Sequence, residues 1–236
     1  MTGINGEEQL KAIAEKLEMW CRTNCREYPW RKSDDPYTIL VTEFLLQRTR
    51  SDIVLRVFND FFLKFGTIDK LASAKKEELY SFFNKVGLLY RAERLLETAK
   101  NVVEKYGGKI PCDFDELLSL NGVGVYMASA VLNFGCNKPT PVVDKNVMRV
   151  MNRVFNVTSE REAREIIVGL YRYGDHKLVA YALIDVGALI CLEPPRCVVC
   201  PLNGVCAKYP LRKNEWRMLR KAIRGGRIGI GEQPVK

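Results

Sequence analysis

The sequence predicts an all-α protein, and three observations support that prediction. Apolar residues recur at helical spacing along most of the 236-residue chain. Alternating polar and apolar residues, the pattern of a half-buried strand, are scarce. Glycine, proline and aspartate fall where helices would begin or end.

The first predicted helix spans residues 8–20, which carry apolar side chains on one face. The apolar segment 39–46 and the periodic segment 53–65 predict two more helices. Gly66 is expected to end the latter helix, and Thr67 to cap a short helix after it. The first quarter of the chain is therefore predicted to be helical with short connections.

The rest of the chain continues this pattern. Residues 90–106 predict a long helix that ends at the Gly107-Gly108 pair. Asp113 or Asp115 is expected to cap the next helix, and Asp144 a later one. Further helices are predicted from about residue 113 to 120, from Tyr126, over residues 145–153, and at least twice within residues 160–190.

Composition and charge narrow the class of protein. The formal net charge is +9, which favours a polyanionic partner such as nucleic acid, although an unspecialised basic surface is the alternative. No apolar run is long enough to span a membrane. The charged N-terminal segment lacks the apolar stretch of a secretory signal. We therefore expect a cytoplasmic protein that does not enter a membrane.

Four of the eight cysteines form a dense cluster near the C-terminus, and the other four are scattered. Cys191, Cys197, Cys200 and Cys206 follow the pattern C-x5-C-x2-C-x5-C. Four thiolates so close in an intracellular chain indicate a metal centre. The spacing alone leaves zinc and an iron–sulfur cluster equally open, because four-cysteine zinc sites usually use two C-x2-C pairs.

A glycine turn and an aspartate form the second candidate site. Leu120-Asn121-Gly122-Val123-Gly124 lies between two predicted helices, and its glycines suit a sharp turn that lets backbone N–H groups approach a phosphate. Many such turns only connect helices. Asp144 follows Gly124 by twenty residues. It is a good N-cap, and a helix N-terminus favours an ionised carboxylate.

Several segments together resemble the helix-hairpin-helix DNA glycosylase superfamily of endonuclease III and MutY type. The N-terminal segments are Tyr28-Pro29-Trp30-Arg31, Asp35-Pro36-Tyr37 and Thr42-Glu43-Phe44-Leu45-Leu46-Gln47-Arg48-Thr49. The family hairpin is usually L-P-G-V-G, with proline where this chain has Asn121. The family cysteine loop is C-x6-C-x2-C-x5-C, one residue longer in its first gap.

The resemblance implies a fold of two lobes and a cofactor. A six-helix lobe with the hairpin is expected over residues 28–138. An iron–sulfur cluster lobe is expected from residues 1–27 and 139–210, followed by a basic C-terminal tail, residues 211–236. The four cysteines of the dense cluster would hold a 4Fe–4S cluster. With the resemblance added, we prefer this cofactor to zinc.

Three catalytic residues follow from the resemblance. Asp144 would stabilise the oxocarbenium-like transition state and help to orient the attacking water. Tyr126 stands where lyase-type members carry a lysine that forms a Schiff base, and where MutY-type members usually carry serine. A tyrosine there is similar to the archaeal thymine–DNA mismatch glycosylases of the Mig type. Glu43 matches the MutY acid that protonates the leaving adenine, and its apolar neighbours predict a buried or cleft position.

The remaining site residues would contact DNA. Gln47 matches the side chain that fills the gap left by the flipped nucleotide, and Arg48 would contact the opposite base or a phosphate. Leu88 or Leu89 would act as a wedge that unstacks the pair, although both suit a core equally. The hairpin residues Gly122, Val123 and Gly124 would bind backbone phosphate.

The predicted function is a monofunctional DNA glycosylase that removes thymine or uracil from T·G and U·G mismatches in double-stranded DNA. We expect it to act as a monomer. The first alternative is an adenine glycosylase acting on A·G or A·8-oxoguanine pairs. An endonuclease III-like glycosylase and lyase is disfavoured by Tyr126. A non-catalytic DNA-binding cluster protein is disfavoured by the presence of both Asp144 and Glu43.

Overall fold

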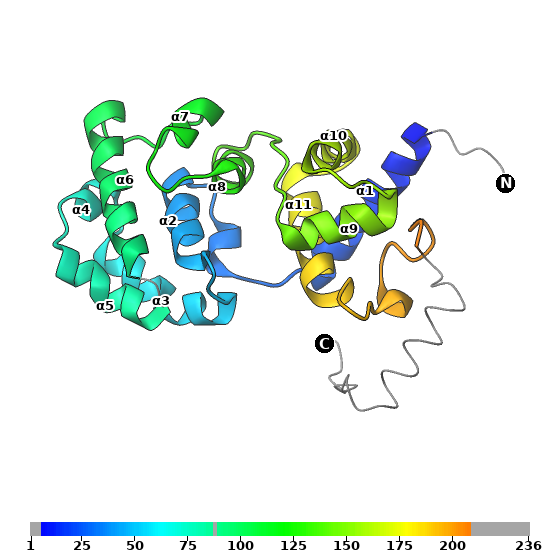
Figure 1. The fold of residues 1–236 in the computed structure, drawn as a ribbon, viewed down its shortest axis with the longest axis horizontal. Coiled ribbons are helices and arrows are strands. Elements are labelled where there is room, and N and C mark those ends of the chain that lie inside the picture. Colours follow the sequence, from blue (N-terminus) through cyan, green and yellow to red (C-terminus); the bar gives the residue numbers. More distant parts are fainter. Residues whose placement is uncertain (1–5, 87–88, 209–236) are drawn as a thin grey trace. The chain divides into compact units, whose positions relative to one another are not determined.

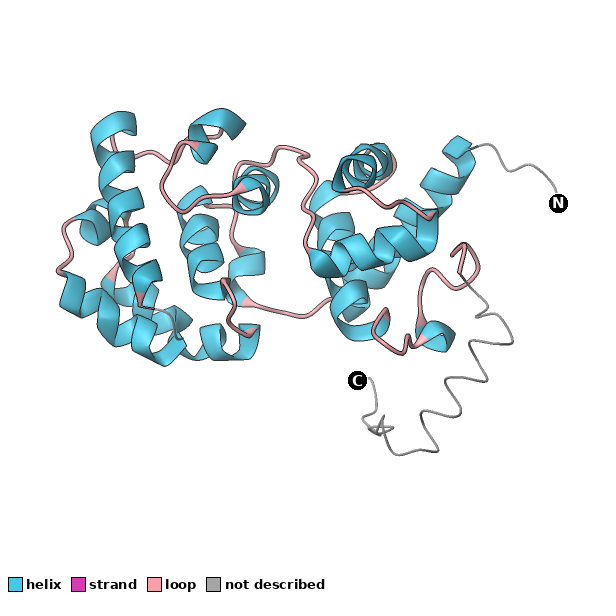
Figure 2. Cartoon of the chain, in the orientation of Figure 1, coloured by secondary structure: helices cyan, strands magenta, loops and turns pink. Residues whose placement is uncertain are grey.

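The computed structural model describes residues 6–86 and 89–208, shown in colour in Figure 1. Within those ranges every regular element is a helix and none is a strand (Figure 2), which confirms the all-α prediction. No helix there is long and apolar enough to cross a membrane. The predicted basic tail, residues 211–236, lies outside the described residues.

The chain divides into two compact units. Arg26–Val142 forms one, which we call the hairpin unit. Residues 6–25 and 143–208 form the other, which we call the cysteine unit. The cysteine unit is therefore built from two separate stretches of the chain, and the hairpin unit from one continuous stretch.

Helix α2 lies at the centre of the hairpin unit. It packs against α3, α6, α8 and the π-turn η2, and it is buried on nearly all sides. A helix that is apolar all round must be covered in this way. A β-carbon on Gly135 would lie 2.6 Å from Cα of Pro36, so glycine lets η2 pack directly on the start of α2. The elements of the hairpin unit are η1 (Pro29–Lys32), α2 (Pro36–Leu46), α3 (Ser51–Lys64), α4 (Ile68–Ala72), α5 (Lys76–Val86), α6 (Tyr90–Tyr106), α7 (Phe114–Leu118), α8 (Val125–Ala130) and η2 (Val131–Gly135).

Helix α11 has the same central place in the cysteine unit. It packs against α1, α9 and α10 and continues into the π-turn η3 (Figure 1). A full capping box at Ser159 and Glu162 starts α10. The elements of the cysteine unit are α1 (Gly6–Asn24), α9 (Lys145–Phe155), α10 (Glu160–Tyr171), α11 (His176–Asp185), η3 (Val186–Ile190) and η4 (Cys197–Val199).

Three predicted N-caps are confirmed by capping hydrogen bonds, whereas the helices predicted over residues 8–20 and from residue 39 begin earlier, at Gly6 and Pro36. Thr67 caps α4, Asp113 caps α7 and Asp144 caps α9, each by accepting a bond from a backbone N–H. Of the two candidates for α7, Asp113 is the cap and Asp115 lies inside the helix. Helix α6 ends at Gly107, whose left-handed conformation is that of a helix C-terminus.

The four scattered cysteines pair as two disulfides, a pairing that their spacing did not predict. Cys21 bonds to Cys25 within the cysteine unit, and Cys112 bonds to Cys136 within the hairpin unit. The second bond joins the segment before α7 to the residue after η2. It therefore closes a covalent ring around the whole helix-hairpin-helix.

Loss of the Cys112–Cys136 bond is expected to destabilise the hairpin unit. A Cys112→Ser/Cys136→Ser protein should lose about 3 kcal/mol of unfolding free energy under oxidising conditions, because the bond restricts a long loop in the unfolded chain. Denaturant unfolding followed by circular dichroism measures the loss. The matched control is Cys21→Ser/Cys25→Ser, whose short loop predicts a smaller loss of about 2 kcal/mol. Equal stability of the first variant and the wild type would contradict the prediction.

Candidate functional site

The predicted hairpin is present as a tight turn between α7 and α8. Gly122 has a φ of +82°, a conformation that residues with a side chain rarely adopt. A β-carbon there would also lie 3.1 Å from Cε1 of Phe44 and 3.3 Å from Cβ of Arg94. Val123 is buried, whereas Gly124 is exposed and a β-carbon on it would meet open space. Gly122 is thus required by conformation and packing, and the backbone at Gly124 is accessible.

Two polar side chains of α6 connect that helix to the hairpin. Thr98 is fully buried and donates its hydroxyl to the carbonyl of Asn121 at 2.6 Å. Asn121 donates its side-chain amide to the carboxylate of Glu97. Asn121 takes the place of the proline in the family hairpin. These two bonds restrain the turn at the position where a proline ring would otherwise restrain it.

Gln47, predicted to fill the gap in DNA, lies beside the hairpin. It follows the last residue of α2, and its Nε2 donates to the carbonyl of Gly122 at 3.5 Å. The next residue, Arg48, is exposed and has a left-handed φ of +53°. The fold therefore brings Gln47 to a hairpin that lies 75 residues later in the sequence.

The other predicted residues of the hairpin unit differ in exposure. Glu43 on α2 and Tyr126 in the first turn of α8 are both half-buried. Leu89 is 42% exposed, so it is not a core residue and is accessible for a wedge role. Leu88, the alternative wedge, lies outside the described residues.

Asp144 caps α9 in the cysteine unit, as predicted. Its Oδ1 accepts a bond from the backbone N–H of Val147 at 2.7 Å, and its Oδ2 accepts one from Nδ2 of Asn146 at 3.0 Å. These two bonds hold the carboxylate in one orientation. The residue is half-buried, so part of it is open to solvent.

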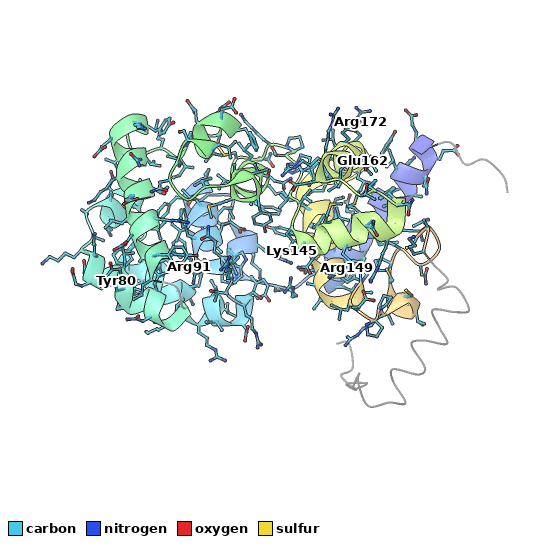
Figure 3. All side chains as sticks on the ribbon, viewed as in Figure 1. Tyr80, Arg91, Lys145, Arg149, Glu162 and Arg172 are labelled. Carbon is cyan, nitrogen blue, oxygen red and sulfur yellow. A yellow bond between two sulfur atoms is a disulfide. The ribbon has the colours of Figure 1, made fainter. Side chains whose placement is uncertain are left out.

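A chain of hydrogen bonds leads from Asp144 to the first cysteine of the dense cluster. Arg149 donates from Nη2 to Oδ1 of Asn146 at 2.9 Å and from Nε to the carbonyl of Cys191 at 2.6 Å. It also donates to the carbonyl of Gly187 at 2.6 Å. A β-carbon on Gly187 would lie 2.8 Å from Asn146, so glycine lets η3 approach α9 this closely. Figure 3 labels Arg149 on α9.

The four clustered cysteines line one pocket in the cysteine unit. Most of the other lining side chains are apolar, among them Val150, Val154, Val186, Ile190 and Leu202. Burial raises the pKa of the Cys200 thiol to about 11, and it also raises the pKa of Cys197. Thiols with raised pKa values stay protonated near neutral pH. A metal that binds thiolate sulfur would have to displace these protons.

None of the four clustered cysteines forms a disulfide. Arg153 of α9 donates to Sγ of Cys191 at 3.4 Å, and Sγ of Cys206 donates to the carbonyl of Arg153 at 3.3 Å. Among the described residues, no three His, Cys, Asp or Glu side chains converge on one metal ion.

The predicted residues are divided between the two units. The hairpin, Glu43 and Gln47 belong to the hairpin unit, whereas Asp144 and the clustered cysteines belong to the cysteine unit. Sequence reasoning missed Asn146 and Arg149. Their signal was present, because positions 146 and 149 are three apart on a helix that Asp144 starts, and side chains at that spacing are neighbours.

An all-helical fold with a glycine hairpin and a capping aspartate defines a known class of DNA repair proteins. Residues 41–171 match the family model described as "HhH-GPD superfamily base excision DNA repair protein". The chain belongs to this superfamily.

Particular members of the superfamily are similar over most of their length. The thymine-DNA glycosylase of Aeropyrum pernix is 33% identical, over 85% of this chain and 96% of that protein. The thymine/uracil-DNA glycosylase of Pyrobaculum aerophilum is 34% identical, over 80% of this chain and 87% of that protein. The solved structure of a thermostable thymine-DNA glycosylase superposes with a TM-score of 0.80 at 32% identity, and the match covers 86% of this chain and 97% of that one.

Proposed function

We propose that this protein is a monofunctional DNA glycosylase that removes thymine or uracil from T·G and U·G mismatches. The observation that carries the proposal is similarity to thymine- and uracil-DNA glycosylases along nearly their whole length. The enzyme would act as a monomer on double-stranded DNA inside the cell. A mispaired base costs less to extrude from the duplex than a paired one, which favours mismatches as substrates.

Asp144 is proposed to stabilise positive charge on the sugar as the base departs. A carboxylate that accepts bonds from Val147 and Asn146 is held in one orientation and needs no reorganisation during the reaction. It would also orient the water that attacks C1′. The products are a free base and an abasic site.

Tyr126 supports the monofunctional assignment. A phenol cannot form the Schiff base that a lysine forms at C1′, so strand cleavage by that route is not available to it. A half-buried tyrosine at the start of α8 suits stacking on a flipped base. Glu43 is proposed to hydrogen-bond or protonate the departing base, a role for which a half-buried carboxyl on α2 is suited.

Recognition of DNA would use the hairpin and the end of α2. The hairpin residues Gly122, Val123 and Gly124 are proposed to bind phosphate, with the exposed backbone of Gly124 the most accessible to it. Gln47 would fill the gap in the helix, Arg48 would contact the opposite base, and Leu89 would separate the stacked neighbours. The net charge of +9 would add affinity that weakens with salt.

The four clustered cysteines are proposed to hold a 4Fe–4S cluster. The absence of disulfides among them, their shared and mostly apolar pocket and the Arg153 donor of α9 support this cofactor. Such a cluster supplies metal–thiolate bonds that tie residues 191–206 together, and it supplies a redox-active centre. Through Arg149 and Asn146, the cysteine loop would help to hold Asp144 in place.

Single-turnover base release from labelled duplexes tests the proposed function. The duplexes carry T·G, U·G, A·G or A·8-oxoguanine, with a paired T·A duplex as the control, and each is assayed with and without alkali. We expect strand breaks in T·G and U·G duplexes only after alkali treatment. Release of adenine alone would instead identify an adenine glycosylase. Breaks without alkali would contradict the monofunctional assignment, and no release from any duplex would contradict the proposed function.

A further inference from the structure

Arg91 is a buried arginine whose hydrogen bonds converge on the end of α2. Its side chain is fully buried. Nη1 donates to the carbonyls of Phe44 at 3.1 Å, Leu45 at 2.9 Å and Gln47 at 2.5 Å. Nη2 donates to the hydroxyl of Thr49 at 3.0 Å. Figure 3 labels Arg91, which lies on α6 next to α2.

The position of Arg91 is costly for a charged group. Burial of a guanidinium removes its hydration, and burial also lowers the pKa of Arg91. The group packs 5.6 Å from the centre of the Phe83 ring, which offsets part of that cost. An apolar side chain of similar volume would often be as stable in such a place. The donors therefore point to a specific task at the carbonyls that they reach.

Those carbonyls belong to the last turn of α2 and to Gln47, the first residue of the loop predicted to enter DNA. A helix end leaves its last carbonyls without intrahelical partners, and Arg91 supplies bonds to them. The residue between its last two partners is Arg48, which has a left-handed φ of +53°. That conformation is uncommon for a residue with a long side chain, and it persists only when its surroundings determine it. Arg91 bonds the residue on each side of Arg48.

The same face of α6 also holds the hairpin. Arg91, Arg94 and Thr98 are three and four residues apart, so they share one side of the helix. Arg94 lies against Gly122, and Thr98 bonds to Asn121. Leu89, the exposed candidate wedge, immediately precedes α6. Helix α6 thus holds residues 47–49 and the hairpin, and the candidate wedge Leu89 stands at its start.

We propose that Arg91 is a positioning residue that fixes residues 47–49 in the conformation needed to penetrate DNA. This inference rests on the proposed function, which assigns Gln47 and Arg48 to DNA. Arg91 itself contacts protein groups and sets the direction of those two side chains. Its loss should therefore impair extrusion of the base more than it impairs overall folding.

The test compares three variants. Arg91→Lys keeps the charge but cannot present several donors in a fixed fork. Thr49→Val removes one acceptor at nearly constant shape. Leu79→Ala creates a cavity in α5, at a fully buried position of the same unit, and is the control for lost stability.

Two measurements separate positioning from stability. Amide hydrogen exchange of residues 44–50, without DNA, should be at least tenfold faster in Arg91→Lys and near the wild-type rate in Leu79→Ala. The fluorescence of a 2-aminopurine placed beside the mismatch should rise when the mismatched base is extruded from the duplex. The rate of this rise should be at least tenfold lower in Arg91→Lys. Thr49→Val should also speed amide exchange and slow the fluorescence rise, each by a smaller factor than Arg91→Lys.

The outcomes are distinct. Wild-type exchange and a wild-type fluorescence rise in Arg91→Lys would overturn the inference, and so would equal changes in Leu79→Ala. A wild-type protein that neither brightens the probe nor releases a base would contradict the proposed function, and the DNA role of Arg91 would fall with it. In that case slow amide exchange in the wild type and fast exchange in Arg91→Lys would still show that Arg91 holds residues 47–49 in place.

Discussion

Replacement of Asp144 by Asn is expected to reduce single-turnover base release by roughly 10³-fold, within the range that a positioned acid or base supplies. Asn keeps the size of the side chain and can still cap a helix, so the bond from Val147 should survive. It removes the negative charge that would face the developing cation. Chemistry should therefore fail while the fold and DNA binding persist.

The matched control for this substitution is Asp175→Asn. Asp175 caps α11 in the same unit, and its side chain accepts from the N–H of Leu178 at 2.9 Å. This variant should release bases at nearly the wild-type rate. If both variants lose activity to the same extent, the loss would come from weakened helix capping and not from a catalytic role of Asp144. If Asp144→Asn keeps more than a tenth of the activity, the catalytic role of Asp144 would be refuted.

Replacement of Cys200 by Ser is expected to have the largest effect on stability. It removes one proposed ligand from a pocket whose other walls are mostly apolar. The cysteine unit should then lose on the order of 4 kcal/mol of unfolding free energy or more, as loss of a metal site can cost. Bound iron and its visible absorption should fall with it, from about four iron atoms per chain.

The Cys112→Ser/Cys136→Ser protein is the control for this experiment, because it lacks two cysteines outside the pocket. It should keep its full iron content. Zinc in place of iron in the wild-type protein would refute the cluster assignment. Unchanged iron and stability in Cys200→Ser would show that Cys200 is not a ligand.

Local signals predicted the helices and their caps well. The prediction of Thr67 and Asp144 as N-caps was correct because capping depends only on a residue and its next three neighbours. Helix α5, Lys76–Val86, was missed although Leu79 and Phe83 are spaced four apart on its buried side. No glycine or proline stands at its start, so its boundary signal was weak.

Residues that act across the fold were not predictable in the same way. Arg91 lies more than 40 positions after the carbonyls that it binds, and an arginine is usually taken for a surface residue. The partners of the scattered cysteines likewise depend on the tertiary fold. The dense cluster and the hairpin were recognised because each is contained in one short segment.

The discontinuous make-up of the cysteine unit has a consequence for synthesis on the ribosome. Helix α1 is made first, but its partners α10 and α11 emerge only after the whole of Arg26–Val142. The continuous hairpin unit can therefore fold while the chain is still growing, whereas α1 must wait for its partners. Cys206, the last of the clustered thiols, emerges later still. Loading of the proposed cluster would therefore be a late event in maturation. Before it, a newly made chain would have the loops proposed to contact DNA but not yet the complete unit that carries Asp144.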